Sequence, residues 1–317
     1  MELPIEFRNI TEELAADIPV KKLISAANAI SERYRSEAAS GKTLITNDTE
    51  AAAYAIVRMP ATIGSSGSAM QYAANRFDDE ITSVLDIGAG TGACSWAAAE
   101  IFPDIEKITC LEREKSMIDF GRKLMEKAEF PFDCEWKSCD ITNGFNLKAD
   151  LVTASYVLNE MPAAMQEKLV SAMWGATEKM MIVIEPGTPK GFKNILRIRK
   201  QLIDKGARIL APCPHGNICP LPEDDWCHFT SRISRTKLHK QLKGGDVPYE
   251  DEKYCFIAAV RGEYEPCSAR ILRHPKIESG KITLKLCTAD GISEKIVTKK
   301  DGVLFKKARK SDCGDEI

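Results

Sequence analysis

The chain of 317 residues contains no run of about 18 apolar residues, so no segment predicts a transmembrane helix. Its first residues, MELPIEFRNITEELAADIP, lack the apolar stretch of a secretory signal and the abundant arginines of an organelle-targeting segment. These absences predict a cytoplasmic protein, or a mitochondrial one whose presequence has been removed. Histidine is scarce, at 4 residues, whereas cysteine is abundant, at 11. In a reducing compartment, cysteines are free, buried or metal-bound more often than paired in disulfides.

Charge of one sign is not in excess overall, since the net charge is −2, but the two parts of the chain differ. Residues 187–317 hold 26 Lys and Arg against 17 Asp and Glu, whereas residues 1–186 hold 18 against 29. Between residues 190 and 243 the bias is sharper, with 12 basic and 4 acidic residues. An excess of solvated surface charge is the simpler explanation of the asymmetry, but its concentration here favours contact with an anionic partner such as RNA.

The order of patterns along the chain predicts an α/β fold with appended units. Residues 1–80 have the apolar spacing of an N-terminal helical region. Short apolar strands alternate with helices over 81–206, which indicates a Rossmann-like core with a parallel sheet, and 251–264 returns as a strand that we expect at its edge. Residues 207–250 form a Cys-rich insertion. Residues 265–317 are predicted to form a small β unit from ARILRHP, KITLKLCTADG, SEKIVTKK and GVLFKKARK.

A glycine-rich loop, DIGAGTG, joins the first strand of this core to its first helix. Glycines let a backbone approach a ligand closely, and the start of a helix offers free N–H groups. An acidic residue ends the second strand about 20 residues later, where ribose hydroxyls are bound in such folds. The candidate cofactor-binding residues are Asp86, Gly88, Ala89, Gly90, Gly92 and Glu112, together with Asp140 and Ile141 after the third strand.

Two details favour S-adenosylmethionine over NAD as the ligand of this loop. Position 93 is alanine rather than the third glycine of the dinucleotide-binding motif. Asp86 precedes the glycines, where the cationic amino group of methionine needs a counter-charge, and Asp140 is placed to read an adenine amino group. A Rossmann-like fold that has lost its ligand is the alternative.

The fourth strand does not identify a catalytic residue. It lacks the Asn-Pro-Pro-Tyr or Pro-Cys sequences of many base methyltransferases and reads SYVLNEMP instead. Asn159 and Glu160 stand at its carboxyl end, where they either hold an acceptor or cap the next helix.

Three cysteines and two histidines fall within residues 213–228, among prolines that stiffen the loop. Closely spaced thiolates of this kind share a metal centre. The spacing C-x5-C-x7-C differs from the C-x2-C pairs of zinc ribbons, and it leaves both zinc and an iron–sulfur cluster open. Cys255 reads as a core residue, and Cys287 precedes a turn, a suitable place for a ligand. The candidates for a fourth ligand are His215, His228, Cys255, Cys267, Cys287 and Cys313.

The segment APCPH…CP…DWCHF…R…R, followed by YEDEKYCFIA, resembles the methyltransferase-like assembly factors of the mitochondrial small ribosomal subunit and their prokaryotic relatives. The segments AYAIVRMPAT and LDIGAGTGACSWAA match as well, so the resemblance covers the chain from about residue 50. It implies a class I methyltransferase core, association with small-subunit rRNA, and a [4Fe–4S] cluster. Carried over by position, the cluster ligands are Cys213, Cys219, Cys227 and Cys287. It leaves open whether a methyl group is transferred.

These observations predict an S-adenosylmethionine-binding protein that acts on small-subunit rRNA, as a methyltransferase or as an assembly factor of the small ribosomal subunit. Trp226 and Phe229 are candidates for stacking on bases. A small-molecule methyltransferase with a structural zinc site and a non-catalytic RNA-binding module are the alternatives. The basic residues expected to contact phosphates are Arg197, Arg199, Lys200, Arg208, Arg232, Arg235, Lys237 and Lys240.

Overall fold

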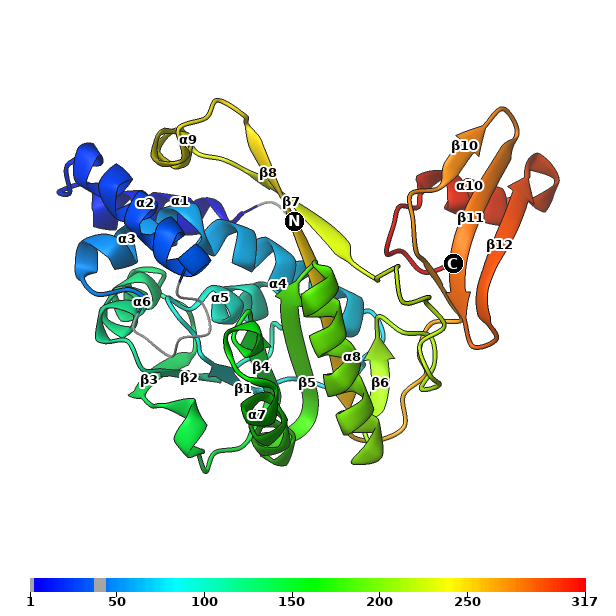
Figure 1. Cartoon of the computed structure of the whole chain (residues 1–317), viewed down its shortest axis with the longest axis horizontal. Coiled ribbons are helices and arrows are strands. Elements are labelled where there is room, and N and C mark those ends of the chain that lie inside the picture. Colours follow the sequence, from blue (N-terminus) through cyan, green and yellow to red (C-terminus); the bar gives the residue numbers. More distant parts are fainter. Residues whose placement is uncertain (1–2, 37–43) are drawn as a thin grey trace.

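The computed structural model describes residues 3–36 and 44–317. Helices cover the first part of the chain, and a large sheet with helices on both faces follows (Figure 1). Within the described ranges, no helix is long and apolar enough to span a bilayer. The N-terminal helices are α1 (Ile5–Ala15), α2 (Val20–Ser36), α3 (Asp48–Val57) and α4 (Met59–Ala74).

The main sheet has eight strands in the order β3–β2–β1–β4–β5–β8–β6, with β7 paired to β8. Strands β1 to β5 are parallel, and β8 runs antiparallel to β5, β6 and β7. Its strands are β1 (Ser83–Ile87), β2 (Lys107–Glu112), β3 (Asp133–Ser138), β4 (Ala149–Ser155), β5 (Thr177–Pro186), β6 (Arg208–Ala211), β7 (Phe229–Ser234) and β8 (Tyr249–Val260). This arrangement is the Rossmann-like α/β core that the alternating pattern predicts.

Helices and short 3-10 turns connect these strands, and two apolar clusters fill the two faces of the sheet. Along β1, Val84 belongs to one cluster and Leu85 to the other, as the alternation of a strand requires. The connecting elements are α5 (Ala93–Ile101), α6 (Lys115–Lys127), α7 (Ala163–Ala176), α8 (Pro189–Asp204) and α9 (Lys237–Lys243), with 3-10 turns η1 (Ile141–Asn143) and η2 (Leu158–Glu160).

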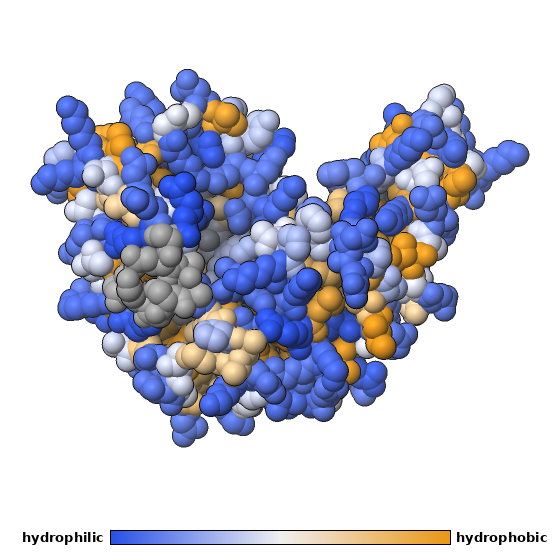
Figure 2. Space-filling model, viewed as in Figure 1, coloured by the Kyte–Doolittle hydropathy of each residue, from blue (hydrophilic) through white to orange (hydrophobic). Residues whose placement is uncertain are grey.

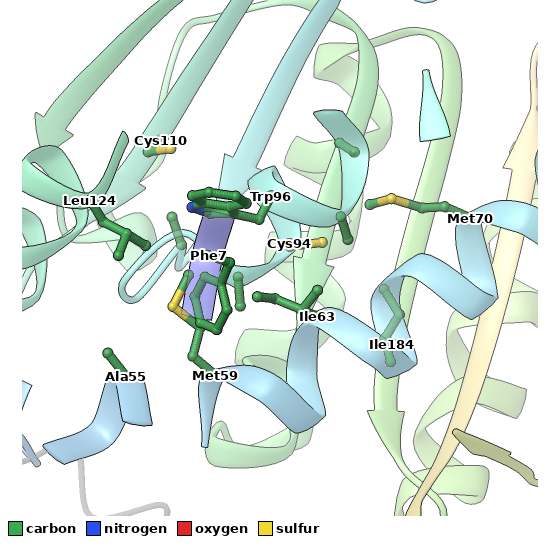
Figure 3. Packing of buried hydrophobic residues seen from close by; sticks show 14 of the residues in the cluster. Phe7, Ala55, Met59, Ile63, Met70, Cys94, Trp96, Cys110, Leu124 and Ile184 are labelled. Atoms are coloured by element: carbon green, nitrogen blue, oxygen red, sulfur yellow. The ribbon is translucent and has the colours of Figure 1, made fainter. Parts of the chain in front are cut away.

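The N-terminal helices are part of the core. Phe7 of α1 meets the indole of Trp96 on α5 edge-on, with ring centroids 5.4 Å apart, and Met59 and Ile63 of α4 lie beside the pair (Figure 3). Phe7 and Trp96 are both buried. The helical region therefore shares one apolar cluster with the sheet rather than forming a separate core.

The strand expected at the edge of the sheet, β8, lies inside it, between β5 and β6. All residues from Tyr254 to Val260 are buried. A continuous apolar run of this kind suits a strand that is covered on both faces, and an edge position would expose it. Residues 207–250, expected as an insertion, contribute β6, β7 and α9. The irregular stretch is therefore residues 212–228.

The C-terminal segment forms a second sheet, which projects from the main body (Figure 1). Its elements are β9 (Ala269–Ile271), β10 (Lys276–Glu278), β11 (Lys281–Thr288), β12 (Gly291–Thr298), the turn η3 (Lys299–Asp301) and α10 (Val303–Lys310). The segment GVLFKKARK was expected as a strand, but it forms helix α10. Leu304, Phe305 and Ala308 share one face of this helix and pack on the sheet, a spacing that a strand does not provide.

Candidate cofactor cleft and cysteine cavity

A cleft of about 700 Å³ opens where the parallel strands end. Its floor includes Gly88 and Gly90 after β1, Glu112 at the end of β2, and Asp140 after β3. Ser155 at the end of β4 also lines the cleft. Ligands of open α/β sheets bind outside the carboxyl ends of the strands, so this cleft is the expected place for a cofactor.

The glycine-rich loop takes a conformation that favours glycine. Gly88 and Gly90 have φ of 66° and 57°, and a Cβ atom at Gly88 would lie 2.6 Å from Cγ2 of Val157. The Gly90 N–H donates to Oε2 of Glu112 at 2.9 Å. The other carboxylate oxygen of Glu112 accepts from the Arg113 and Glu114 N–H groups at 2.7 and 2.9 Å. Glu112 therefore holds the loop in place while it lines the cleft.

The structure brings five of the eight candidate cofactor residues to the cleft: Gly88, Gly90, Glu112, Asp140 and Ile141. Ala89 and Gly92 do not line the cleft, and the Gly92 N–H donates to the Ala89 carbonyl oxygen at 2.8 Å within the loop. Asp86 is buried, and its carboxylate accepts from Ser95 Oγ at 2.8 Å and Thr153 Oγ1 at 2.9 Å. Burial raises the pKa of Asp86 to about 6. The carboxylate thus faces the interior, not the place expected for a methionine amino group.

The N-terminal helices close the cleft with side chains that the strand–helix pattern does not reveal. The rings of Tyr34 and Tyr54 stack with centroids 6.4 Å apart, and the Arg58 guanidinium lies 5.7 Å from the Tyr34 centroid. All three line the cleft. Tyr54 lies on α3, and Arg58 caps the C-terminus of this helix one turn later. This spacing of four residues is the one sequence signal that could have placed their side chains on the same face.

Acidic side chains, among them Glu160 and Glu252, also line the cleft. Burial, reinforced by the nearby charges of Glu112 and Glu114, raises the pKa of Glu160 to about 7. Tyr156, at the end of β4, has φ of 62°, a left-handed conformation that is rare for a bulky residue. Its phenol oxygen lies 3.0 Å from Ser65 Oγ and 3.1 Å from Glu252 Oε1. These contacts tie the end of β4 to α4 and β8.

A second, smaller cavity collects the cysteines. Cys213, Cys219, Cys227 and Cys287, the four cysteines that the resemblance singles out, all line it, and Cys255 joins them. Its volume is about 40 Å³, which exceeds the roughly 10–15 Å³ that one water molecule needs. Cys287 comes from β11, so the cavity links the irregular stretch 212–228 to the second sheet.

Two buried arginines line the same cavity. Arg270 donates to the carbonyl oxygens of Pro212 and Gly314 at 2.8 and 2.9 Å, and to Glu316 at 3.2 Å. Arg199 donates through Nη2 to the His215 carbonyl oxygen at 2.7 Å, while its Nε is buried without a partner. Burial raises the pKa of the Cys287 thiol to about 12.

The other candidate ligands have different surroundings. The Cys255 thiol donates to the Cys227 carbonyl oxygen at 3.1 Å, and the Cys313 thiol donates to the Leu272 carbonyl oxygen at 3.3 Å. His215 Nε2 lies 3.7 Å from Cys287 Sγ. Across residues 3–36 and 44–317, no three His, Cys, Asp or Glu side chains are grouped as ligands of one metal ion. The thiols line a cavity rather than converge on a point.

Most basic side chains expected to contact RNA are engaged within the protein. Phe229 is buried against Tyr72 and Phe256, so it is not available to stack on a base. The Trp226 indole donates to the Gly187 carbonyl oxygen at 3.0 Å. An anionic partner would compete with internal carboxylates for several of the cations: Lys200 pairs with Asp204, Arg208 with Glu263, Arg232 with Asp251 and Arg235 with Glu250.

Comparison with known protein families identifies the family of this chain. Residues 48–317 match the family model described as mitochondrial small ribosomal subunit Rsm22. The chain belongs to the Rsm22 family. The resemblance to the small-subunit family is therefore confirmed, and the strand order shows a Rossmann-like α/β fold with a mixed sheet.

Two curated relatives carry names of the same kind. The human protein named ribosome assembly protein METTL17, mitochondrial, is 24% identical over 258 residues, covering 74% of this chain and 54% of its own length. Rsm22-cox11 tandem protein 2, mitochondrial, of Schizosaccharomyces pombe is 23% identical over 292 residues, covering 73% and 38%. This chain thus spans about half or less of these relatives. Both are named as mitochondrial, so the cytoplasmic location expected for this chain stays a prediction.

Solved structures resemble the chain at low identity. A putative RNA methyltransferase from Pyrococcus horikoshii has a TM-score of 0.41 and 16% identity, covering 62% of this chain and 81% of its own. Magnesium protoporphyrin IX methyltransferase from Synechocystis has a TM-score of 0.43 and 13% identity, covering 75% and 97%.

Proposed function

We propose that this member of the Rsm22 family binds S-adenosylmethionine in the cleft and acts on small-subunit rRNA, as an rRNA methyltransferase or as an assembly factor of the small ribosomal subunit. Family membership over residues 48–317 is the observation that carries the proposal. The name of the human relative, a ribosome assembly protein, supports it.

The cleft supports the cofactor part of the proposal. Glu112 ends β2 beside the glycine loop, where an acidic side chain accepts hydrogen bonds from ribose hydroxyls. Helix α5 begins at Ala93, directly after the loop, and its first N–H groups suit an anionic carboxylate. Asp140 and Ile141 line the same cleft after β3 and would hold the adenine.

A methyl acceptor would enter beside Asn159 and Glu160, at the end of β4. A carboxyl with a pKa of about 7 takes up and releases protons near neutral pH, which suits a general base. If the chain transfers a methyl group, Glu160 is therefore the residue to test for proton removal from the acceptor.

Isothermal titration with S-adenosylhomocysteine tests the cofactor site. We expect Glu112→Ala to weaken binding at least tenfold, because it removes both a ribose contact and the support of the Gly90 N–H. Glu106→Ala, at an exposed position just before β2, is the matched control and should bind like the wild type. A wild-type chain that binds neither S-adenosylhomocysteine nor S-adenosylmethionine would favour a non-catalytic RNA-binding module.

The C-terminal unit supports contact with RNA. Exposed cations on η3 and α10 form no ion pair in the part of the chain that the structure describes; they are Lys299, Lys300, Lys306, Lys307, Arg309 and Lys310. Clustered cations of this kind bind phosphates and release counterions. By contrast, Lys276 of β10 lies near Glu278.

Ultraviolet crosslinking of the tagged chain in its host, followed by sequencing of the attached RNA, tests the partner. We expect enrichment of one site on small-subunit rRNA. The charge reversal Lys306→Glu/Lys307→Glu should reduce this enrichment, while Lys276→Glu should not. No enrichment over background with intact S-adenosylhomocysteine binding would favour a small-molecule methyltransferase.

We also propose that Cys213, Cys219, Cys227 and Cys287 hold a [4Fe–4S] cluster, with zinc as the alternative. The residues fit such a group, because the four thiols line one apolar cavity together with a buried guanidinium whose Nε lacks a partner. When bound, the cluster would supply a cross-link between residues 212–228 and the second sheet, and a one-electron centre.

Purification without oxygen, with iron, sulfide and zinc measured per chain, tests this site. Cys219→Ser should lose the metal and make residues 212–317 sensitive to protease, whereas Cys134→Ser, outside the cavity, should keep both properties. Zinc without sulfide in the wild type would favour the structural zinc site, and full iron in Cys219→Ser would contradict the ligand set.

A further inference from the structure

Helix α8 carries one arginine on its apolar face. Ile195 and Arg199 are four residues apart and both line the cysteine cavity, with Phe192 one turn earlier. Arg199 is 5% exposed. An arginine in such a position cannot contact an RNA phosphate at the surface, although the basic bias of this segment suggested that role.

The contacts of Arg199 do not neutralise it. Its Nη2 donates to a neutral group, the His215 carbonyl oxygen, at 2.7 Å. Its Nε has no partner, and within the described ranges no carboxylate lies at ion-pair distance. Arg270, on the other wall, differs because Glu316 lies 3.2 Å from it.

A buried cation without a counter-charge costs several kcal/mol, so folded proteins keep one where an anion joins it. The cavity offers sulfur rather than carboxylate. The Cys213 thiol lines the same cavity as the Arg199 guanidinium. Four cysteine thiolates around an iron–sulfur or zinc centre leave a net negative charge in the cavity.

We infer that Arg199 is the internal counter-cation of the thiolate-bound centre, and that it raises the affinity of the cavity for the centre and the reduction potential of a bound cluster. This inference rests on the proposed cluster. The physical reason is that a cation beside the centre stabilises its negative charge, and reduction by one electron adds a further negative charge. The bond to His215 also ties the start of the cysteine loop to α8.

Removing the charge of Arg199 should change the Tm in opposite directions in the metal-free and in the loaded protein. Arg199→Met keeps the apolar stem and removes the charge, so it should raise the Tm of the metal-free chain. Loading the centre should raise the Tm of this variant by less than it raises the Tm of the wild type. A purely structural arginine would shift the metal-free and the loaded Tm in the same direction.

Redox titration with dithionite, followed by electron paramagnetic resonance, supplies the second readout. At a fixed potential we expect at least a tenfold lower ratio of reduced to oxidised cluster in Arg199→Met, equal to ~59 mV for a one-electron couple. Arg199→Lys keeps the charge and should lie between the two. Lys200→Met, on the exposed face of α8, is the control and should match the wild type.

The outcomes separate the two proposals. A wild-type chain without iron and sulfide overturns the cluster, and with it the effect on potential. If loading raises the Tm of Arg199→Met as much as that of the wild type, and the two clusters have the same reduction potential, only the role of Arg199 is overturned. If Arg199→Met does not fold, an Arg199→Lys variant whose ratio of reduced to oxidised cluster is lowered less than tenfold supports the inference, and a ratio lowered tenfold or more contradicts it.

Discussion

Replacing Asp86 by asparagine tests whether this buried carboxyl belongs to the fold or to the ligand. The carboxyl is 1% exposed, accepts hydrogen bonds from two hydroxyls, and has its pKa raised from 3.8 to about 6 by burial. Ionising it in the folded protein therefore costs roughly 3 kcal/mol more than in the unfolded chain, at about 1.4 kcal/mol per pH unit. Asparagine has the same shape and carries no charge.

The sign of the pH dependence follows from the raised pKa. Below about pH 3 both the folded and the unfolded chain keep the proton, so this carboxyl imposes no penalty. As the pH rises from 3.8 to about 6, the unfolded chain loses its proton first, and the stability of the wild type falls. Asp86→Asn lacks this loss. Its free energy of unfolding, relative to the wild type, should therefore increase by about 2.4 kcal/mol between pH 4 and pH 7.

Urea unfolding followed by tryptophan fluorescence at several pH values between 4 and 7.5 measures the difference between the two proteins. Asp140→Asn is a useful control, because hydrogen bonds from Thr142 lower the pKa of Asp140, so its contribution has the opposite sign. A difference between Asp86→Asn and the wild type that stays constant with pH would refute the reasoning.

Three further predictions concern the core and the cleft. Phe7→Ala should lower the free energy of unfolding by about 3–5 kcal/mol, whereas Ile5→Ala, at a position 74% exposed on the same helix, should change it by less than ~0.5 kcal/mol; chemical unfolding measures both. Gly88→Ala should weaken S-adenosylhomocysteine binding more than Gly90→Ala, because its Cβ would meet Val157 at 2.6 Å while that of Gly90 meets Met117 at 3.4 Å, and equal losses in calorimetry would contradict this. Tyr156→Asn should lower the Tm, although asparagine tolerates φ of 62° better, because the ring packs against the core and its oxygen contacts Ser65 and Glu252; an unchanged Tm would show that the strain outweighs these contacts.

The local sequence pattern was sufficient to predict the place of a residue where that place depends only on its own segment. The glycine loop had to follow a strand and open a helix, because backbone approach to a ligand needs glycine and free N–H groups at one place. The acidic residue at position 112 was placed by counting from that loop.

The sequence pattern did not predict the structure where an apolar segment is compatible with more than one element or place in the fold. The apolar run in β8 is typical of a strand covered on both faces, but the run does not specify its neighbours, and the order of the strands decided that β8 lies between β5 and β6. The segment 303–310 has too few apolar residues for its spacing to distinguish a short strand from a short helix. Packing of Leu304, Phe305 and Ala308 on the second sheet decided the helix.

The sequence by itself determined the α/β core, the place of the glycine loop and the family, because these depend on local spacing and on residues near one another in the chain. Tertiary structure decided which side chains meet. It brought Cys287 to cysteines about 60–75 positions earlier, turned Asp86 inward, and buried Arg199 beside thiols instead of at the surface. The direction and partners of a charged side chain depend on contacts between segments distant in sequence, and on the cost of leaving a charge without water or a counter-ion.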